Sequence, residues 1–486
     1  MAAPLGLVAQ DLVARATGPQ LGRWQEQVAA TGYCAHPIRL SGRTMHVDRA
    51  TGEVREVYDT ACEPDAVLLT ACGNRRESRC PSCAATYRAD AYQLVRAGLE
   101  GGKGVPESIA GHPRLFVTFT APSFGSVHTC RERRGKRRPC RPRDRDKCCP
   151  HGRPVGCWVR HRPDDPVLGA PICLDCFDAE GLVLWNALAP ELWRRTTIYL
   201  RRALAAATGT TPARLHRTIR VAFVKVAEYQ ARGAIHFHAV IRLDAAPPKD
   251  TPDQVSPPPA PFTADLLVQA VEAAAAHASV TCPAVDDAPP RVARWGAQLD
   301  VREIRQAGPG ELSAEAVAGY IAKYATKGTE SYGAALDRRI YHEHELDHLR
   351  VPAHIARLAR VCWTLGGEPA LTSLRLRQWA HMLGFRGHWS TKSRRYSTTL
   401  GALRGARAAH AEARRLAGAV PLDAWQRPMT DQAVAVVKEW GYAGTGYRTV
   451  GDAWLAASAA ARARERRRIA REELTSTTAA ALSLIA

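Results

Sequence analysis

Two histidines separated by one residue form the first pattern in this sequence that could support chemistry. His236 and His238 lie in segment 235–243, where apolar and β-branched residues predict a strand. Side chains two positions apart on a strand point to the same face, so both imidazoles are expected on one face and the apolar residues on the other. Such a pair could bind a metal ion, but two strand histidines can also be ordinary surface or core residues.

A carboxylate is expected beside the histidine pair. Segment 220–229 also predicts a strand, and the short segment 230–234 between the two strands is typical of a hairpin turn. Folding this hairpin about Arg232 places Glu228 opposite His236. Two imidazoles and one carboxylate could hold Mg²⁺ or Mn²⁺ with positions left open for a phosphate oxygen. Gln230 is a competing third ligand, and Glu228 could instead be a plain surface carboxylate.

A second reactive pattern lies in segment 319–328, which predicts a helix. Its tyrosines and lysines recur at spacings of three and four and therefore share one helical face: Tyr320, Lys323, Tyr324 and Lys327. A phenolate can attack phosphorus, and an ammonium group offsets the negative charge that develops. The alternative is a stripe of tyrosine and lysine side chains at a domain surface.

The cysteines predict structural metal sites. Twelve of the fourteen cysteines fall before residue 180, and in a reducing compartment they are better read as metal ligands than as disulfides. A first Zn²⁺ site is predicted at Cys62, Cys72, Cys80 and Cys83. A second is predicted at Cys149, Cys157, Cys173 and Cys176, with Cys140, Cys148, His151 and His161 as substitutes or members of a further site. Zinc could present the basic residues of this segment to DNA or could serve stability alone.

The secondary-structure pattern around these residues indicates an α+β fold. The predicted order is a strand at 114–122, an irregular Cys-, His-, Arg- and Pro-rich insertion at about 125–180, a helix at 188–204 with Pro190 in its first turn, and then the hairpin. A helix capped by Thr263, a strand at 295–304 and a helix capped by Ser313 follow. This order suits an antiparallel sheet with helices on one face, of ferredoxin-like type.

Composition divides the 486 residues into three expected domains. Residues 1–110 form a Cys-rich region with one helix near 87–97, residues 111–330 carry the sheet and its insertion, and residues 331–486 are basic and mostly helical. The net charge of +20 and the pI near 9.7 favour a polyanionic partner, of which nucleic acid is the foremost, although solvated basic surface is the alternative. No segment is apolar over a membrane-spanning length, so we expect a cytoplasmic protein without a membrane partner.

Three motifs together resemble the HUH endonuclease superfamily: the Thr-containing strand at 114–122, the His-hydrophobe-His strand, and the helix with the pattern YxxKYxxK. More narrowly, the sequence is similar to the replication initiator proteins of actinomycete plasmids and integrative elements. The segments 72–83, 149–152, 173–176 and 394–404 carry this narrower resemblance.

The resemblance implies a nickase that initiates rolling-circle replication. Tyr324 or Tyr320 would attack the scissile phosphate and remain joined to the 5′ end of the DNA, His236 and His238 would hold the divalent ion, and a free 3′-hydroxyl would prime synthesis. Many plasmid relatives have glutamate where Tyr320 stands, so Tyr324 is expected to act first, with Lys323 beside it. Lys327 and Arg232 are expected to contact DNA.

Two other functions remain open at this stage. A related HUH transposase or relaxase would share the chemistry and differ in the DNA chosen, whereas a non-enzymatic zinc-containing DNA-binding regulator would leave the tyrosine helix unused. The expected partner is single-stranded origin DNA. The sequence has no GxxxxGK[ST] phosphate loop, so a host helicase is expected to unwind the duplex.

Overall fold

The computed structural model describes residues 5–142, 147–285, 289–305, 312–328, 336, 338–417 and 434–483. The chain forms two compact units, Met1–Ala89 with Pro421–Ala486, and Asp90–Val420. Among the described residues, no helix has both the length and the apolar character that crossing a membrane requires.

A five-stranded antiparallel sheet is the centre of the unit formed by residues 90–420. Its strand order is β11-β4-β8-β7-β12, and β4, β7 and β8 are almost entirely buried. The strands are β4 (Arg114–Phe119), β7 (Ile219–Tyr229), β8 (Ile235–Ala245), β11 (Leu299–Glu303) and β12 (Ser390–Lys392). The β7–β8 hairpin lies where the alternation of apolar residues predicts it. The edge strand β12 comes from the region beyond residue 331 and pairs with β7.

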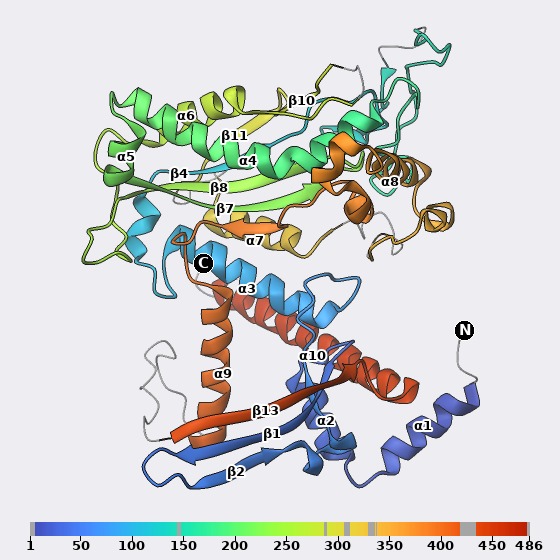
Figure 1. Cartoon of the computed structure of the whole chain (residues 1–486), viewed down its shortest axis with the longest axis vertical. Coiled ribbons are helices and arrows are strands. Elements are labelled where there is room, and N and C mark those ends of the chain that lie inside the picture. Colours follow the sequence, from blue (N-terminus) through green and yellow to red (C-terminus); the bar gives the residue numbers. More distant parts are fainter. Residues whose placement is uncertain are drawn as a thin grey trace. The chain divides into compact units, whose positions relative to one another are not determined.

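Helices cover both faces of this sheet (Figure 1). Helices α4 (Ala179–Ala207) and α6 (Ala264–His277) lie on one face, and α7 (Ala314–Ala325) lies on the other. On the α4 face, the ring of Trp193 packs edge-on against Phe119, Phe223 and Phe237. The expected α+β class with antiparallel sheets is confirmed. Helices were expected on one face of the sheet, and α7 is the helix that also covers the other, the face carrying the histidines.

Helix α4 begins nine residues before its predicted start. Asp178 caps it by accepting a hydrogen bond from the Gly181 N–H, and Pro190, which was expected in the first turn, lies inside the helix. Proline removes one helical hydrogen bond. Because of this loss, proline in a sequence is usually taken to mark a helix boundary. Here the preceding turns are continuously buried from Leu182 to Ala189, and this packing offsets the lost bond. The caps predicted for α6 and α7 are confirmed, because Thr263 and Ser313 accept hydrogen bonds from Leu266 and Ala316.

Smaller elements complete this unit. Its further helices are α5 (Pro212–Thr218), α8 (Ala353–Leu365) and α9 (Leu400–Ala417), and its short strands are β5 (Arg131–Arg133), β6 (Lys136–Arg138), β9 (Ser279–Thr281) and β10 (Val292–Arg294). Helix α3 (Pro81–Glu100) runs across the boundary between the units. In the described part of the insertion, which omits residues 143–146, the β5–β6 hairpin and isolated bridges are the strand pairings present, in keeping with its lack of periodicity.

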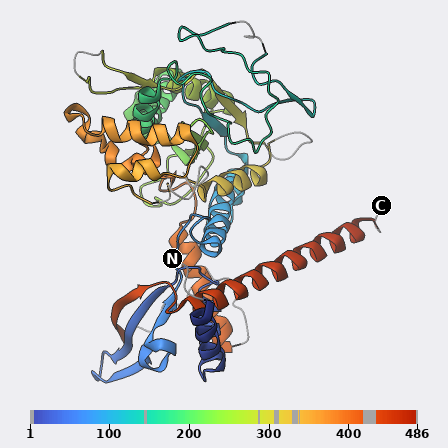
Figure 2. The ribbon, with the colours of Figure 1, turned by 90° about the vertical axis from the view of Figure 1, so that its right-hand side faces the viewer.

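The other unit joins the two ends of the chain. Strand β1 (Ile38–Asp48) pairs with β2 (Val54–Asp59) and β3 (Leu68–Thr70), and along its full length with β13 (Val434–Thr445). Three helices accompany this sheet: α1 (Leu5–Thr17), α2 (Leu21–Ala30) and α10 (Val450–Ser483), the last a single continuous helix in Figure 2. Trp24 and Val28 of α2 pack with Ala456 of α10 in one apolar cluster. Composition does not reveal this association, which joins segments about four hundred residues apart.

Candidate functional site

The β7–β8 hairpin gathers two imidazoles and a carboxylate on one face of the sheet. Glu228 pairs directly with His236 in the register predicted from the sequence. The Oε2 atom of Glu228 lies 3.1 Å from His236 Nε2 and 2.9 Å from His238 Nε2. The competing ligand Gln230 lies beyond the end of the strand, where its side-chain oxygen accepts a hydrogen bond from Arg232 Nε. Glu228 is therefore the third member of this group.

The electrostatics of the three groups suit a divalent cation. Burial lowers the pKa of His238, which keeps its imidazole neutral and able to donate a lone pair. Burial alone would raise the pKa of Glu228, but hydrogen bonds with His236 and His238 outweigh it and lower the pKa to about 2. Two imidazoles with one carboxylate form a ligand set that divalent cations accept, with coordination positions left open for substrate.

A residue on β4 orients His238. Thr118 Oγ1 lies 3.1 Å from His238 Nδ1, so the Nε2 atom of the ring faces Glu228. Hydrogen bonds to the second ring nitrogen commonly fix a ligand histidine in this way. Sequence reasoning noted the threonines of this strand without giving them a role. Thr118 pairs with His238 between β4 and β8. A prediction of which residues pair between these two strands would therefore have identified Thr118.

Both tyrosines of α7 face the His/Glu group. The hydroxyl of Tyr320 lies 3.2 Å from His238 Nε2, and its ring packs edge-on against Phe116. The ring of Tyr324 lies 4.6 Å from that of Tyr320 and 5.7 Å from that of His238, measured between ring centres. Burial raises the pKa of both phenols, which are therefore protonated at neutral pH in the absence of a bound cation.

The two lysines of the helix accompany Tyr324. Their Nζ atoms lie 5.5 Å (Lys323) and 4.9 Å (Lys327) from the centre of the Tyr324 ring. The opposite side of α7 is apolar and buried, and the backbone carbonyl of Tyr324 accepts a hydrogen bond of 2.9 Å from Trp389 Nε1. Trp389 directly precedes β12, so the region beyond residue 331 fixes the end of this helix. Residue spacing does not predict that contact.

Arg232 holds the hairpin turn in place. Its guanidinium donates hydrogen bonds to the backbone oxygens of Pro122 (2.8 Å) and Ala121 (3.0 Å), just after β4, and to Gln230. These bonds tie the turn beside the histidines to the neighbouring strand. The expected contacts of Arg232 and Lys327 with DNA stay predictions.

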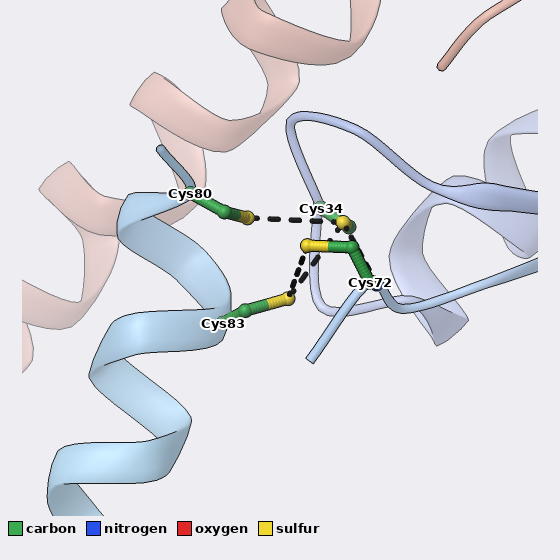
Figure 3. A group of neighbouring side chains, drawn as sticks. All are labelled: Cys34, Cys72, Cys80 and Cys83. Atoms are coloured by element: carbon green, nitrogen blue, oxygen red, sulfur yellow. Dashed lines mark hydrogen bonds between the residues drawn. The ribbon is translucent and has the colours of Figure 1, made fainter. Parts of the chain in front are cut away.

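A four-thiol cluster lies in the unit formed by the two chain ends, and one of its members differs from the predicted set. Figure 3 shows the side chains of Cys34, Cys72, Cys80 and Cys83 converging from three segments. Cys62 is solvent-exposed and lies outside the cluster, so its assignment is corrected to Cys34. Cys62 sits in a 3-10 turn after β2, whereas Cys34, in the loop between α2 and β1, is fully buried against Cys80 and Cys83. Spacing along the chain cannot reveal this, because Cys34 reaches the cluster only through the tertiary fold.

The sulfur distances in this cluster fit a tetrahedral metal site. The Sγ atoms of Cys34, Cys80 and Cys83 lie 3.6 to 3.7 Å apart where they are in contact. Four thiolates around Zn²⁺ at about 2.3 Å have edges of about 3.8 Å. Hydrogen bonds with Cys80 and Cys83, together with burial, raise the pKa of the Cys34 thiol.

The insertion contains two clusters, where the sequence predicted one site and left a further site open. The first contains Cys149, His151, Cys173 and Cys176, and the second contains His128, Cys140, Cys157 and His161. Cys157, predicted with the first group, is therefore reassigned to the second, and His151 takes its place. The prediction allowed for His151, Cys140 and His161 but missed His128, which lies far from any cysteine pair with metal-binding spacing. Cys148 is exposed and belongs to neither.

A carboxylate supports the second cluster. His161 directs Nε2 to Cys157 Sγ at 3.5 Å and to His128 Nδ1 at 3.2 Å, while its Nδ1 lies 2.7 Å from Asp165. The hydrogen bond with His161 lowers the pKa of Asp165. A carboxylate on the second nitrogen of a ligand histidine is common at zinc sites, since it fixes the tautomer and increases the basicity of the ring. All three clusters could hold a metal such as zinc.

Comparisons with known proteins place these features in a family. The family described as "Replication initiator protein, pSAM2" (RepSA) matches residues 20–461. The chain belongs to the RepSA family. A replication initiator protein of Streptomyces ambofaciens is 48% identical over 467 residues, which cover 95% of each chain. No solved structure matches the sequence.

The RepSA match extends over both units of the structure. It includes the His/Glu group, both tyrosines and every residue of the three Cys/His clusters. It also includes both β1 and β13, the strands that join the two ends of the chain. The resemblance to replication initiators expected from short motifs is thus confirmed over nearly the whole sequence.

Proposed function

We propose that this replication initiator nicks one DNA strand at its origin and becomes joined to the 5′ end through a phosphotyrosine. The observation that carries the proposal is the position of two tyrosines against the Glu228, His236 and His238 group. A DNA-binding regulator without enzymatic activity would need the basic charge and the cysteine clusters but not this arrangement. The HUH class, single-strand specificity and rolling-circle mode belong to the same proposal.

The reaction is a transfer of one phosphoryl group between two oxygens. The phenol oxygen of a tyrosine attacks the scissile phosphorus, a P–O bond to tyrosine forms, and the bond from phosphorus to the 3′ oxygen breaks. The tyrosine loses its proton, and the 3′ oxygen gains one to become the free hydroxyl. Mg²⁺ or Mn²⁺ bound by Glu228, His236 and His238 would polarise the phosphate oxygens. Because burial raises the pKa of both phenols, this attack needs such a positive field nearby.

The surroundings of the tyrosines favour Tyr324 as the first nucleophile. Two ammonium groups, those of Lys323 and Lys327, lie within 5.5 Å of its ring and would stabilise its phenolate and the charge on the phosphate. Tyr320 instead contacts Phe116 and His238. We assign Tyr320 to the second transfer, in which it would attack the regenerated origin and end a round of replication.

We further propose that each of the three Cys/His clusters binds Zn²⁺. Thiolate and imidazole donors select zinc, whereas the His/Glu group accepts harder divalent ions. In the irregular insertion, two metal sites would supply the stability that apolar burial does not. A host helicase would unwind the duplex after the nick.

Adduct formation tests the proposed function. The purified chain is incubated with tiled single-stranded oligonucleotides from the replicon that encodes it, with Mg²⁺ or Mn²⁺. We expect one oligonucleotide to yield a covalent protein–DNA band together with a fragment ending in a 3′-hydroxyl. The double variant His236→Ala, His238→Ala should bind the same DNA and give no adduct. Absence of an adduct with every oligonucleotide would favour the regulator, and cleavage at a transfer origin or transposon end would favour a relaxase or transposase.

A further inference from the structure

A groove lies against the turn that joins β7 and β8, the two strands that carry the His/Glu group. Its volume is about 650 Å³, and its walls come from the insertion on one side and from the hairpin turn and the segment before β11 on the other. His128, Arg141 and Gly169 line the insertion side. Gln230 and Gln298 line the sheet side. All of these residues belong to the unit formed by residues 90–420.

Two of the strands that carry or adjoin the His/Glu group lead directly to residues of the groove. Gln298 precedes Asp300 by two residues, and Asp300 pairs with Thr118, the residue that orients His238. Gln230 follows Glu228 by two residues, and its backbone N–H still pairs with the Ala234 carbonyl. Two residues of strand span about 7 Å and return to the same face. Both glutamines lie just past the ends of their strands, so each is two residues, roughly 7 Å of chain, from Asp300 or Glu228.

The insertion wall is held firmly in position. At Gly169, where φ is +84°, a Cβ atom would lie 2.1 Å from the carbonyl carbon of Ala231, so only glycine allows the insertion to approach the turn this closely. On the same wall, His128 belongs to the cluster with Cys157 and His161. Metal bound there would fix the groove lining directly.

The lining suits a nucleotide. Among the described residues that form the groove there is no aspartate or glutamate, whereas Arg141 and Arg232 supply positive charge. Arg141 donates from Nε to the Val127 carbonyl, and its terminal nitrogens make no hydrogen bond to any described residue. Glutamine amides present a donor and an acceptor side by side, the pattern that recognises base edges, and exposed bases of single strands are read in this way.

We propose that this groove binds a nucleotide adjacent to the nick, with Gln298 reading its base edge and Arg141 contacting its phosphate. The inference rests on the proposed nicking function and assigns to the metal-binding insertion the outer wall of the substrate site. Selectivity for the base beside the nick then resides in Gln298, in the segment before β11, whereas the insertion holds the DNA backbone through Arg141.

The test uses single-stranded DNA with randomised positions on both sides of the mapped nick and fixed outer flanks. Both cleavage products are sequenced, which gives the base preference at every position for the full-length chain. Gln298→Ala should flatten the preference at one or two positions beside the nick by about tenfold to a hundredfold and leave the others intact. Arg141→Ala should weaken cleavage of all sequences alike and reduce the salt dependence of binding by about one phosphate contact. Gln269→Ala, an exposed glutamine on α6, is the matched control and should behave as wild type.

Different results separate this inference from the proposed function. If wild type forms adducts and Gln298→Ala keeps every base preference, the groove does not read a base and the inference is overturned while nicking stands. If wild type forms no adduct, the proposed nicking function is rejected. The groove is then tested separately, by measuring the affinity of each variant for a fluorescent randomised 20-mer without added Mg²⁺ or Mn²⁺. Weaker binding by Arg141→Ala, with Gln269→Ala unchanged, would support a DNA groove, and equal binding by all variants would reject it.

Discussion

The proposed active group of this protein combines the Glu228, His236 and His238 cluster with two tyrosines whose surroundings differ. Tyr320 shares His238 with Glu228, whereas Tyr324 lies beside two lysines. Two phenols one helical turn apart can thus serve the same phosphate while having different charges around them. This difference makes their roles separable by substitution.

Removal of each phenol oxygen should separate the two transfers. Tyr324→Phe should abolish the first covalent adduct, because phenylalanine keeps the ring packing and lacks the attacking oxygen. Tyr320→Phe should keep the first adduct and impair the second transfer. A single-turnover adduct assay followed by a strand-joining assay measures both, with DNA binding as the control for folding. Loss of the first adduct in Tyr320→Phe alone would reverse the assignment, and adducts in both variants would require another nucleophile.

At the scale of elements, Cys/His clusters and strand pairing bring together segments that have little core of their own. The thiol cluster joins the loop after α2, the loop after β3 and the start of α3, as Figure 3 shows. In the other unit, β7 carries Glu228 on one face and the buried Lys225 on the opposite face, 4.1 Å from the Phe237 ring. Each of these features gives a measurable property.

Zinc content should distinguish Cys34 from Cys62. We expect three zinc ions per chain for wild type, two for Cys34→Ser and three for Cys62→Ser, because only Cys34 lies in a thiol cluster. Elemental analysis after purification without chelator gives these numbers. The two variants make the same chemical change, so Cys62→Ser controls for the substitution itself. Equal zinc loss in both would contradict the cluster described here.

Lys225 should make stability depend on pH. Burial lowers its pKa from 10.5 to about 7, so between these values the unfolded chain binds a proton that the folded chain does not. Stability from this group therefore rises with pH across that window, by up to roughly 5 kcal/mol in total, and is lowest below pH 7. Lys225→Met should raise the melting temperature at pH 7 and lose this pH dependence. An equal slope between pH 7 and 9 for wild type and variant, by thermal unfolding, would show that Lys225 is not buried as a neutral amine.

At the scale of the whole molecule, the N-terminal segment depends on the C-terminal one. Strand β13 supplies the long partner of β1, and Asp452 of α10 forms an ion pair with Arg15 of α1. Ala456 completes the apolar cluster around Trp24. The two ends of the chain thus build one folded unit, separated in sequence by the unit that carries the tyrosines.

Truncation tests this dependence. A chain ending at residue 417 should lose protection of residues 1–89 against limited proteolysis, because β1 is left with an unpaired edge and the Trp24 cluster is opened. Residues of the central sheet should stay protected in the same digest, and they serve as the internal control. Continued protection of residues 1–89 in the truncated chain would show that β13 and α10 are dispensable for that unit.

The sequence alone determined the features that depend on local spacing. The alternation of segment 235–243 gave the shared face of His236 and His238, the short turn gave the pairing of Glu228 with His236, and helical spacing gave the tyrosine and lysine face. The serine and threonine caps are equally local, since a side-chain oxygen and an N–H three residues on define them.

Only the tertiary structure decided which distant segments meet. Cys34 rather than Cys62 completes the thiol cluster. Cys157 lies with His128 rather than with Cys149, and β13 pairs with β1. In each case several residues of the right type were available, and their chemistry is the same. The choice among them follows from packing and loop closure over long separations, which residue spacing does not encode.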